Sequence, residues 1–308
     1  MKPEISIIMA TYNRAHFIVE TLQSIQKQTF ENFECLIIDD GGTDNTLEVI
    51  QPIIGNDKRF LFLKRTEKYK KGLPGCRNYG LDIAKGNYII FFDDDDIIHS
   101  QNLATTIQIL KNEDFDFCCY QKESFINEIP VEKYLPVSIE KNISSEIIAE
   151  IITKKTLIAS CTVLWKKKCF DTIRFNESLM YAEEWECYTR IILQDRKGVQ
   201  INSILYFNRK HSNSNTSQFY DNNKIRRESN RDAILLNLKS VQSKNLLSAA
   251  ILKYFIQIAY NFRELNLIDD VFNQVKLSLP TKIYWKIYYK MLPFRIANTR
   301  LLKRLKIK

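Results

Sequence analysis

Short runs of apolar residues that stop at polar or acidic positions recur three times in the first hundred residues. Residues 5–14 read ISIIMATYNR, residues 34–46 read ECLIIDDGGTDNT and residues 87–96 read NYIIFFDDDD. Runs of β-branched and aromatic residues are typical of buried strands, and helical spacing or helix-capping residues follow the first two runs. The recurring order of strand, polar tip, turn and helix predicts an α/β fold with a doubly wound, mostly parallel sheet.

Four consecutive aspartates, at positions 93–96, directly follow the third run. In open α/β sheets, ligands bind beyond the carboxyl ends of the strands. Two carboxylates about 5 Å apart repel each other by roughly 3 kcal/mol at an effective dielectric constant of about 20, so the crowding calls for a stabilising partner. An extended backbone would direct Asp93 and Asp95 to one side, as a pair of ligands for Mg²⁺ or Mn²⁺. The alternative is a solvated acidic turn that caps a helix beginning near Ser100.

Glycine-rich phosphate loops of the two common kinds are missing from the sequence. No Gly-x-Gly-x-x-Gly follows the first apolar run, and no Gly-x-x-x-x-Gly-Lys-Ser/Thr occurs in the chain. Both motifs bind phosphate through backbone N–H groups. Their absence argues against a dinucleotide-binding Rossmann domain and favours a metal ion as the partner of any bound phosphate.

Four segments, in this order, resemble the signature blocks of the family 2 glycosyltransferases. They are ATYNR (10–14), IIDDGGTDNT (37–46), GCRNYGLDIAKGNYIIFFDDDD (75–96) and NESLMYAEEWECYTR (176–190). The resemblance covers roughly residues 4–215. It implies the GT-A fold and an inverting transfer of a sugar from a nucleotide-diphosphate donor.

The resemblance also implies which residues hold the donor. It implies that the nucleotide is bound by eight residues: Ala10, Thr11, Tyr12, Arg14, Asp40, Arg77, Asp93 and Asp94. Asp95, with Asp93, is implied to bind the Mn²⁺ or Mg²⁺ ion that bridges the diphosphate. The segment YFNRKHS (206–212) resembles a block in which a histidine completes this site, so His211 is a third candidate ligand, with a hydrogen-bonded surface histidine as the alternative. For Arg77, neutralisation of Asp93 and contact with the diphosphate both stay open.

On the acceptor side, the family's general base is a carboxylate of a Glu-Asp pair that opens a helix. Glu183 and Glu184 match this pair, and Glu184 stands where an aspartate is usual. We expect Glu184 to be the base, with Glu183 as the second candidate. Apart from the resemblance, the segment fits an acidic first turn stabilised by the helix dipole, with Trp185 and Tyr188 in the core.

The implied reaction uses a nucleotide sugar, with UDP the commonest nucleotide in the family, and a glycan or lipid-linked acceptor of cell-surface polysaccharide synthesis. A nucleotidyltransferase is one alternative, but ATYNRAHF is not the glycine-rich loop it needs. A non-catalytic binder of membranes or nucleic acid is another, and it leaves Asp40, Asp95 and Glu184 without a role. We therefore expect no nucleic-acid partner, and the sequence predicts no oligomeric state.

Composition is typical of a globular enzyme. The chain has 308 residues, 45% of them hydrophobic, which is enough for one large core and a smaller appendage. Seven cysteines without any Cys-x-x-Cys predict buried, reduced thiols. No run of 18 apolar residues and no signal-peptide pattern occurs, so we expect no transmembrane helix and a cytoplasmic protein.

The pattern changes near residue 215, which predicts a catalytic domain at 1–215 and a helical region at 216–308, joined by a polar linker at 213–218. Residues 271–308 contain ten Lys or Arg and no Asp or Glu, and subtracting this +10 from the net +9 leaves −1 for the rest. Aromatic residues, among them Trp285 and Tyr288, alternate with these cations. Two interpretations stay open: an anchor on an anionic membrane, at the inner face of the plasma membrane, or packing of Trp285 and its neighbours on the catalytic domain.

Overall fold

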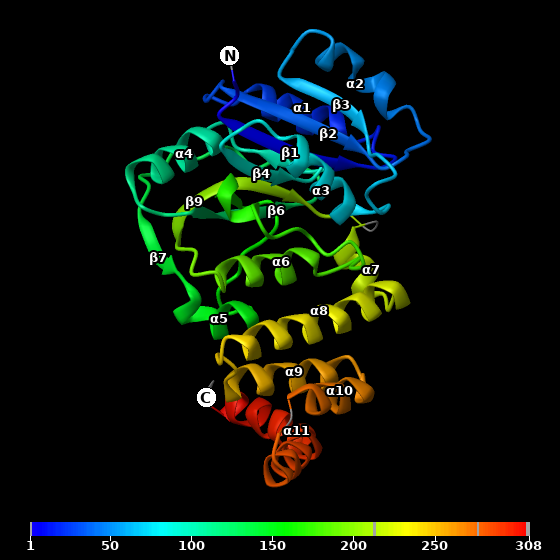
Figure 1. Ribbon diagram of the computed structural model, residues 1–308, viewed down its shortest axis with the longest axis vertical. Coiled ribbons are helices and arrows are strands. Elements are labelled where there is room, and N and C mark those ends of the chain that lie inside the picture. Colours follow the sequence, from blue (N-terminus) through cyan, green and yellow to red (C-terminus); the bar gives the residue numbers. More distant parts are fainter. Residues whose placement is uncertain (1, 212–213, 276, 306–308) are drawn as a thin grey trace.

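A mixed sheet with helices on both faces forms one half of the molecule, and a stack of helices forms the other (Figure 1). The computed structural model describes residues 2–211, 214–275 and 277–305. The strands are β1 (Ile5–Thr11), β2 (Phe33–Asp39), β3 (Phe60–Lys64), β4 (Tyr88–Phe92), β5 (Ile97–Ile98), β6 (Phe117–Phe125), β7 (Ile139–Ile143), β8 (Val163–Lys166) and β9 (Gly198–Arg209). The α-helices are α1 (Ile18–Gln26), α2 (Thr46–Ile54), α3 (Leu73–Ile83), α4 (Asn102–Asn112), α5 (Ile148–Ile152), α6 (Glu183–Ile192), α7 (Asn215–Tyr220), α8 (Lys224–Ser243), α9 (Ala249–Asn261), α10 (Leu265–Val275) and α11 (Leu279–Leu305).

The strand order is β3-β2-β1-β4-β8-β6-β9-β5, and β7 pairs with β9. The first four strands are parallel, with Ile7 of β1 level with Cys35 of β2 and Ile90 of β4. The predicted α/β fold is confirmed. The sheet is mixed, however: β8 runs antiparallel to both β4 and β6, and β9 is parallel to β6 but antiparallel to β5 and β7.

Alternation along the parallel strands divides the core between the two faces of the sheet. Ile8, Leu36 and Phe91 pack on the face covered by α3 and α6, whereas their neighbours Ile7 and Ile37 pack on the face covered by α1 and α4. Each fully buried aliphatic or aromatic side chain contributes about 1.5–3 kcal/mol. All seven cysteines are buried as free thiols. The two-sided burial explains why these strands are almost continuously apolar.

The second half of the chain is helical, as expected from its periodicity. Helices α8 to α11 stack beneath the sheet domain, and between residues 214 and 305 of the described chain there is no strand (Figure 1). Phe255 of α9 contacts Trp185 of α6, with ring centroids 6.3 Å apart, so the stack shares a core with the sheet domain. The predicted linker is wrong in part: α7 begins at Asn215, and Ser214 caps it by accepting a hydrogen bond from the backbone N–H of Ser217 at 3.1 Å. Asn213 lies outside the described residues.

The basic tail contains α11, which packs through part of its aromatic surface. Trp285 and Tyr288 are only 6% and 8% exposed, and Tyr289 contacts Tyr260 of α9 with ring centroids 6.0 Å apart. Trp285 and Tyr288 are therefore buried by packing within the helical region, on α9 and α10, whereas the expected packing was on the catalytic domain. Among the described helices, none combines the length and the apolar character needed to cross a membrane.

Candidate functional site

A cavity of about 920 Å³ opens beyond the carboxyl ends of β1, β2 and β4, three adjacent strands of the sheet. Twelve residues predicted from the sequence line it: Ala10, Thr11, Tyr12, Arg14, Asp40, Arg77, Asp93, Asp94, Asp95, Glu183, Glu184 and His211. A hollow of about 1020 Å³ lies elsewhere, around Lys2 and Lys58, and contains none of them. The structure thus brings together every predicted site residue, from Ala10 to His211.

The loop after β2 is held in place by Asp40. One carboxylate oxygen accepts a hydrogen bond from Arg65 Nε at 2.6 Å, and the other accepts one from the backbone N–H of Gly72 at 2.9 Å. Gly72 precedes α3 and has a φ of +127°, a backbone conformation that favours glycine. Each carboxylate oxygen has two lone pairs, so Asp40 can accept a further hydrogen bond from a ligand. Nearby, the exposed ring of Tyr12 lies 4.6 Å from Lys71 Nζ.

The four aspartates form a turn between β4 and β5 and not an extended strand. The expected alternation of sides is therefore wrong. Asp94 and Asp95 both face Arg14, with N–O distances of 3.4 Å, although an extended backbone would have separated them. Asp96 also lines the cavity, and accepts hydrogen bonds from the backbone N–H of Arg209 at 2.7 Å and from Asn208.

The acidic turn is electrostatically strained, as its sequence suggested. Burial, followed by the charge of Asp95, raises the pKa of Asp94 to about 8. Burial, followed by the charge of Asp93, raises the pKa of Asp95 and brings that of Asp96 to about 7. A bound cation would lower this cost.

The donor set of the turn is compatible with a divalent ion. Oδ2 of Asp95 lies 2.9 Å from Nε2 of His211, so a carboxylate and an imidazole converge on one point of the cavity. Among the described residues, no three His, Cys, Asp or Glu side chains are grouped so as to hold a metal by themselves. Mg²⁺ typically takes only one or two carboxylates from the protein and completes its shell with water and substrate phosphates. The residues present fit an ion held partly by a diphosphate.

Arg77 connects the two sides of the cavity. Its side chain is 2% exposed, and its guanidinium lies 3.5 Å from Asp93 Oδ1, 3.3 Å from Glu183 Oε1 and 2.6 Å from Ser160 Oγ. The rings of Phe91 and Phe175 lie 5.6 and 5.3 Å from it. Of the two roles left open for Arg77, ion pairing with Asp93 matches this geometry. The additional ion pair between Arg77 and Glu183 was not predicted from the sequence.

The two glutamates at the start of α6 have different environments. Ala182 precedes them in a left-handed conformation, with φ 62°. Glu183 is 5% exposed, and its burial, followed by the charge of Glu184, raises its pKa to about 8 despite Arg77. Glu184 is half-buried and lines the cavity without an ion pair to Arg77. Of the two, Glu184 is the more accessible to an acceptor.

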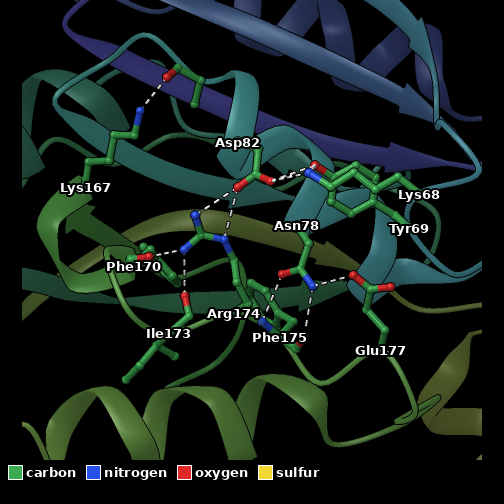
Figure 2. A network of polar contacts seen from close by, with 11 residues as sticks. Lys68, Tyr69, Asn78, Asp82, Lys167, Phe170, Ile173, Arg174, Phe175 and Glu177 are labelled. Atoms are coloured by element: carbon green, nitrogen blue, oxygen red, sulfur yellow. Dashed lines mark hydrogen bonds and ion pairs between the residues drawn. The ribbon is translucent and has the colours of Figure 1, made fainter.

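A polar network holds the segment before α6 against α3 (Figure 2). Asn78 accepts a hydrogen bond from the backbone N–H of Phe175 at 2.9 Å and donates to Phe175 O and to Glu177 Oε1, at 2.9 and 2.7 Å. Asp82 pairs with Arg174 at 2.9 Å and accepts from the hydroxyl of Tyr69 at 2.6 Å. The network fixes where α6 begins, and so where the glutamate pair stands.

Several cavity residues were not identified from the sequence. Arg209 donates from Nε to the backbone carbonyl of Asp95 at 2.9 Å, and its guanidinium lies 5.2 and 4.8 Å from the ring centroids of Phe17 and Phe125. Arg209 lies between the end of a strand pattern and His211 in the sequence, and this position could have identified it as a site residue. Arg226 of α8 reaches the cavity by donating to the backbone carbonyl of Met180, a contact that crosses the predicted domain boundary and has no local sequence signal.

Known proteins are similar to this chain in sequence and in architecture. Residues 6–170, more than half of the chain, match the model of the family described as "Glycosyl transferase family 2". An Escherichia coli relative, UDP-Glc:alpha-D-GlcNAc-diphosphoundecaprenol beta-1,3-glucosyltransferase WfaP, is 30% identical over 210 residues, which span 68% of this chain and 78% of that protein.

Two solved structures share the GT-A fold. Residues 1–349 of Staphylococcus aureus TarS, in complex with UDP-GlcNAc, superpose with a TM-score of 0.65 at 21% identity, covering 82% of this chain and 71% of that one. The mannosyltransferase PcManGT from Pyrobaculum calidifontis, in complex with GDP-Man and Mn²⁺, gives a TM-score of 0.58 at 14% identity, covering 97% and 84%. At these identities the likeness concerns the fold alone, whereas the family match extends to the sequence. The chain belongs to glycosyltransferase family 2.

Proposed function

We propose that this enzyme is an inverting glycosyltransferase that moves a sugar from a UDP-sugar to a hydroxyl of a glycan or lipid-linked acceptor in cell-surface polysaccharide synthesis. The observation that carries the proposal is that one cavity holds both the acidic turn after β4 and the glutamate pair of α6. The UDP-GlcNAc bound by TarS supports the donor, and the diphosphoundecaprenol acceptor named for the E. coli relative supports the acceptor. Family membership sets aside the nucleotidyltransferase and the non-catalytic binder.

In this proposal the ends of β1 and β2 hold the nucleotide. Its base and ribose contact the loop that contains Ala10, Thr11, Tyr12 and Arg14, together with Asp40, Asp93 and Asp94, all of which line the cavity. Asp40 offers its remaining lone pairs to a base N–H, and the hydrogen bonds from Arg65 and Gly72 fix its orientation. Arg77 keeps Asp93 in place through the ion pair at 3.5 Å.

Asp95, Asp93 and His211 would hold Mn²⁺ or Mg²⁺, and the Mn²⁺ of the PcManGT complex supports this assignment. The ion would act as a Lewis acid that stabilises negative charge on the leaving diphosphate. Arg14, which faces Asp94 and Asp95, is placed to add positive charge on the same side.

The transfer is a single displacement. The acceptor hydroxyl loses its proton to the carboxylate of Glu184, and its oxygen forms a bond to the anomeric carbon of the donor. The bond from that carbon to the diphosphate oxygen breaks on the opposite side, and UDP leaves with the electron pair, which inverts the anomeric configuration. A general base of this kind contributes about 10²–10⁴-fold. Glu183, paired with Arg77 at 3.3 Å, positions the start of α6.

Residues 1–215 form the catalytic unit in this proposal, and the helical region 216–308 closes the cavity on the side of Arg226. The proposed location is the cytoplasm, at the inner face of the plasma membrane. There the enzyme would have access to both the nucleotide sugar and the lipid-linked acceptor.

The test is a transfer assay with the full chain. Radiolabelled UDP-glucose, UDP-GlcNAc and UDP-galactose, each with Mn²⁺, are incubated with undecaprenyl-diphosphate-linked GlcNAc, and the lipid phase is counted. We expect label to move into the lipid from one of the UDP-sugars, and Glu48→Gln, which changes an exposed glutamate on α2, to transfer at the native rate. Absence of both UDP binding and transfer for every donor would refute the proposal.

A further inference from the structure

Helix α11 carries apolar side chains on two opposite sides. Trp285, Tyr288 and Leu292 are buried, with at most 8% of their surface exposed, in the core that they share with α9 and α10. A second apolar set on the same helix is 48% to 69% exposed: Ile283, Tyr284, Ile287, Met291 and Phe294. At about 100° per residue, Ile283, Ile287 and Phe294 lie within about 20° of the direction opposite Trp285. We name this second set the outer stripe.

The outer stripe is not a consequence of packing inside the described chain. A surface helix normally presents one apolar face to the core and polar residues to water, whereas a helix that is apolar on both sides is buried on both sides or faces a membrane. Contiguous exposed apolar surface of this kind marks an interaction site. At one end of the molecule, α11 lies beyond α8 and α9 and far from the sheet (Figure 1).

The positive charge beside the outer stripe indicates a negatively charged partner. Lys282, Lys286 and Lys290 follow one another at intervals of four residues and form a cationic row along one edge of the stripe. Asp269 of α10 is the acidic group that meets this row, at 3.6 Å from Lys286. From residue 271 to the end the sequence has ten cations and no Asp or Glu, so an anionic surface complements this end of the molecule.

We propose that the outer stripe and its lysine row dock on the surface of a membrane that contains acidic phospholipids. The apolar side chains would enter the headgroup boundary while the lysines contact lipid phosphates, which is the arrangement of interfacial amphipathic helices. A second copy of the chain is the competing occupant. Two copies joined through this face would bring two rows of three lysines together, with only Asp269 of each copy described as paired to its row, and the remaining repulsion disfavours a dimer. The proposal does not depend on the transferase activity.

The first experiment is sedimentation of the full chain with vesicles of phosphatidylglycerol and phosphatidylcholine, and with phosphatidylcholine alone. We expect binding to the mixed vesicles, and a loss of at least about tenfold in partitioning for Ile283→Ser/Ile287→Ser, since two exposed isoleucines leave the contact. Val131→Ser/Leu135→Ser is the matched control, because these side chains are 82% and 68% exposed but lie on a distant loop where Glu132 and Lys133 balance each other. This control should bind like the native chain.

A second readout identifies the face that meets the lipid. All three tryptophans, Trp165, Trp185 and Trp285, are buried, so native fluorescence should stay unchanged when vesicles are added. In Ile287→Trp the new indole should shift to shorter wavelength with phosphatidylglycerol vesicles and not with phosphatidylcholine. Circular dichroism verifies that each variant is folded.

Three results would overturn the proposal. The first is that the native chain fails to sediment with acidic vesicles. The second is that the double isoleucine variant binds these vesicles as tightly as the native chain. The third is that sedimentation equilibrium finds a dimer that Ile287→Ser dissociates. A lack of transferase activity would leave these vesicle measurements unaffected.

Discussion

Replacing Glu183 by glutamine should change how the free energy of unfolding depends on pH. Burial and the charge of Glu184 raise the pKa of Glu183 from 4.5 to about 8, although Arg77 opposes the shift. The folded state therefore retains a proton that the unfolded state releases. The stability contributed by this group is complete below pH 4.5 and is lost as the pH rises through 8.

The size of the effect follows from the two pKa values. Between them, each pH unit lowers the free energy of unfolding by about 1.4 kcal/mol for one proton, or about 5 kcal/mol over the whole interval as an upper bound. Glutamine has nearly the shape of the protonated glutamic acid and does not titrate. At pH 5 the variant and the native protein should therefore unfold at similar urea concentrations, and above pH 6 the variant should become the more stable of the two.

Urea unfolding followed by tryptophan fluorescence, at pH values from 5 to 8.5, measures the difference. Asp94 and Asp96 titrate in both proteins, so their contributions largely cancel. Glu48→Gln, an exposed exchange of the same atoms, should follow the native curve at all pH values. Parallel curves for Glu183→Gln and the native protein would mean that Glu183 is ionised in the folded state, and so would contradict its raised pKa.

Other substitutions test the metal, the central ion pair and the core. Asp95→Ala should weaken UDP binding in Mn²⁺ by at least about tenfold in calorimetry, and equal UDP affinity of the native protein in excess chelator would contradict a metal role. Arg77→Met should destabilise the protein by about 3–5 kcal/mol at pH 8.5, and by less at pH 6, where Glu183 is protonated, in the same urea assay; an equal loss at both pH values would speak against the pair. Gly198→Ala should cost about 1–3 kcal/mol, because its Cβ would lie 2.1 Å from the ring of Phe117, while UDP affinity stays native; unchanged stability would contradict this packing.

The parallel half of the fold and the location of the site were predictable from the sequence. The apolar runs before Thr11, Asp40 and Asp93 end at one edge of the sheet because parallel strands place their carboxyl ends together, and this brings the donor-side residues into one cavity. The other half, in which β6 and β9 are parallel and the remaining pairs antiparallel, was not predictable in the same way. Its strands pair with partners far along the chain, as when Trp165 of β8 meets Ile89 of β4, and no local pattern specifies that pairing.

The directions of the side chains within the site were harder to predict than which residues belong to the site. The alternation expected for the four aspartates failed because they form a turn, in which Asp96 caps the backbone N–H of Arg209. The ion pair between Arg77 and Glu183 joins residues 106 positions apart and depends on how α3 and α6 pack. In the tail, the sequence identified the aromatic and basic composition, but only the packing on α9 and α10 distinguishes Trp285, which is buried, from Ile287, which is exposed.

Whether Glu184 is the general base is tested by the rate of sugar transfer by Glu184→Gln, measured beside the affinity of this variant for UDP. If Glu184 takes the proton of the acceptor hydroxyl, transfer from the UDP-sugar to the lipid-linked acceptor should fall by about a hundredfold or more. Calorimetry should find native UDP affinity in the same variant, because the nucleotide contacts lie at the other side of the cavity. Near-native transfer by Glu184→Gln, together with loss of transfer in Glu183→Gln, would contradict the account and assign the base to the glutamate that Arg77 holds.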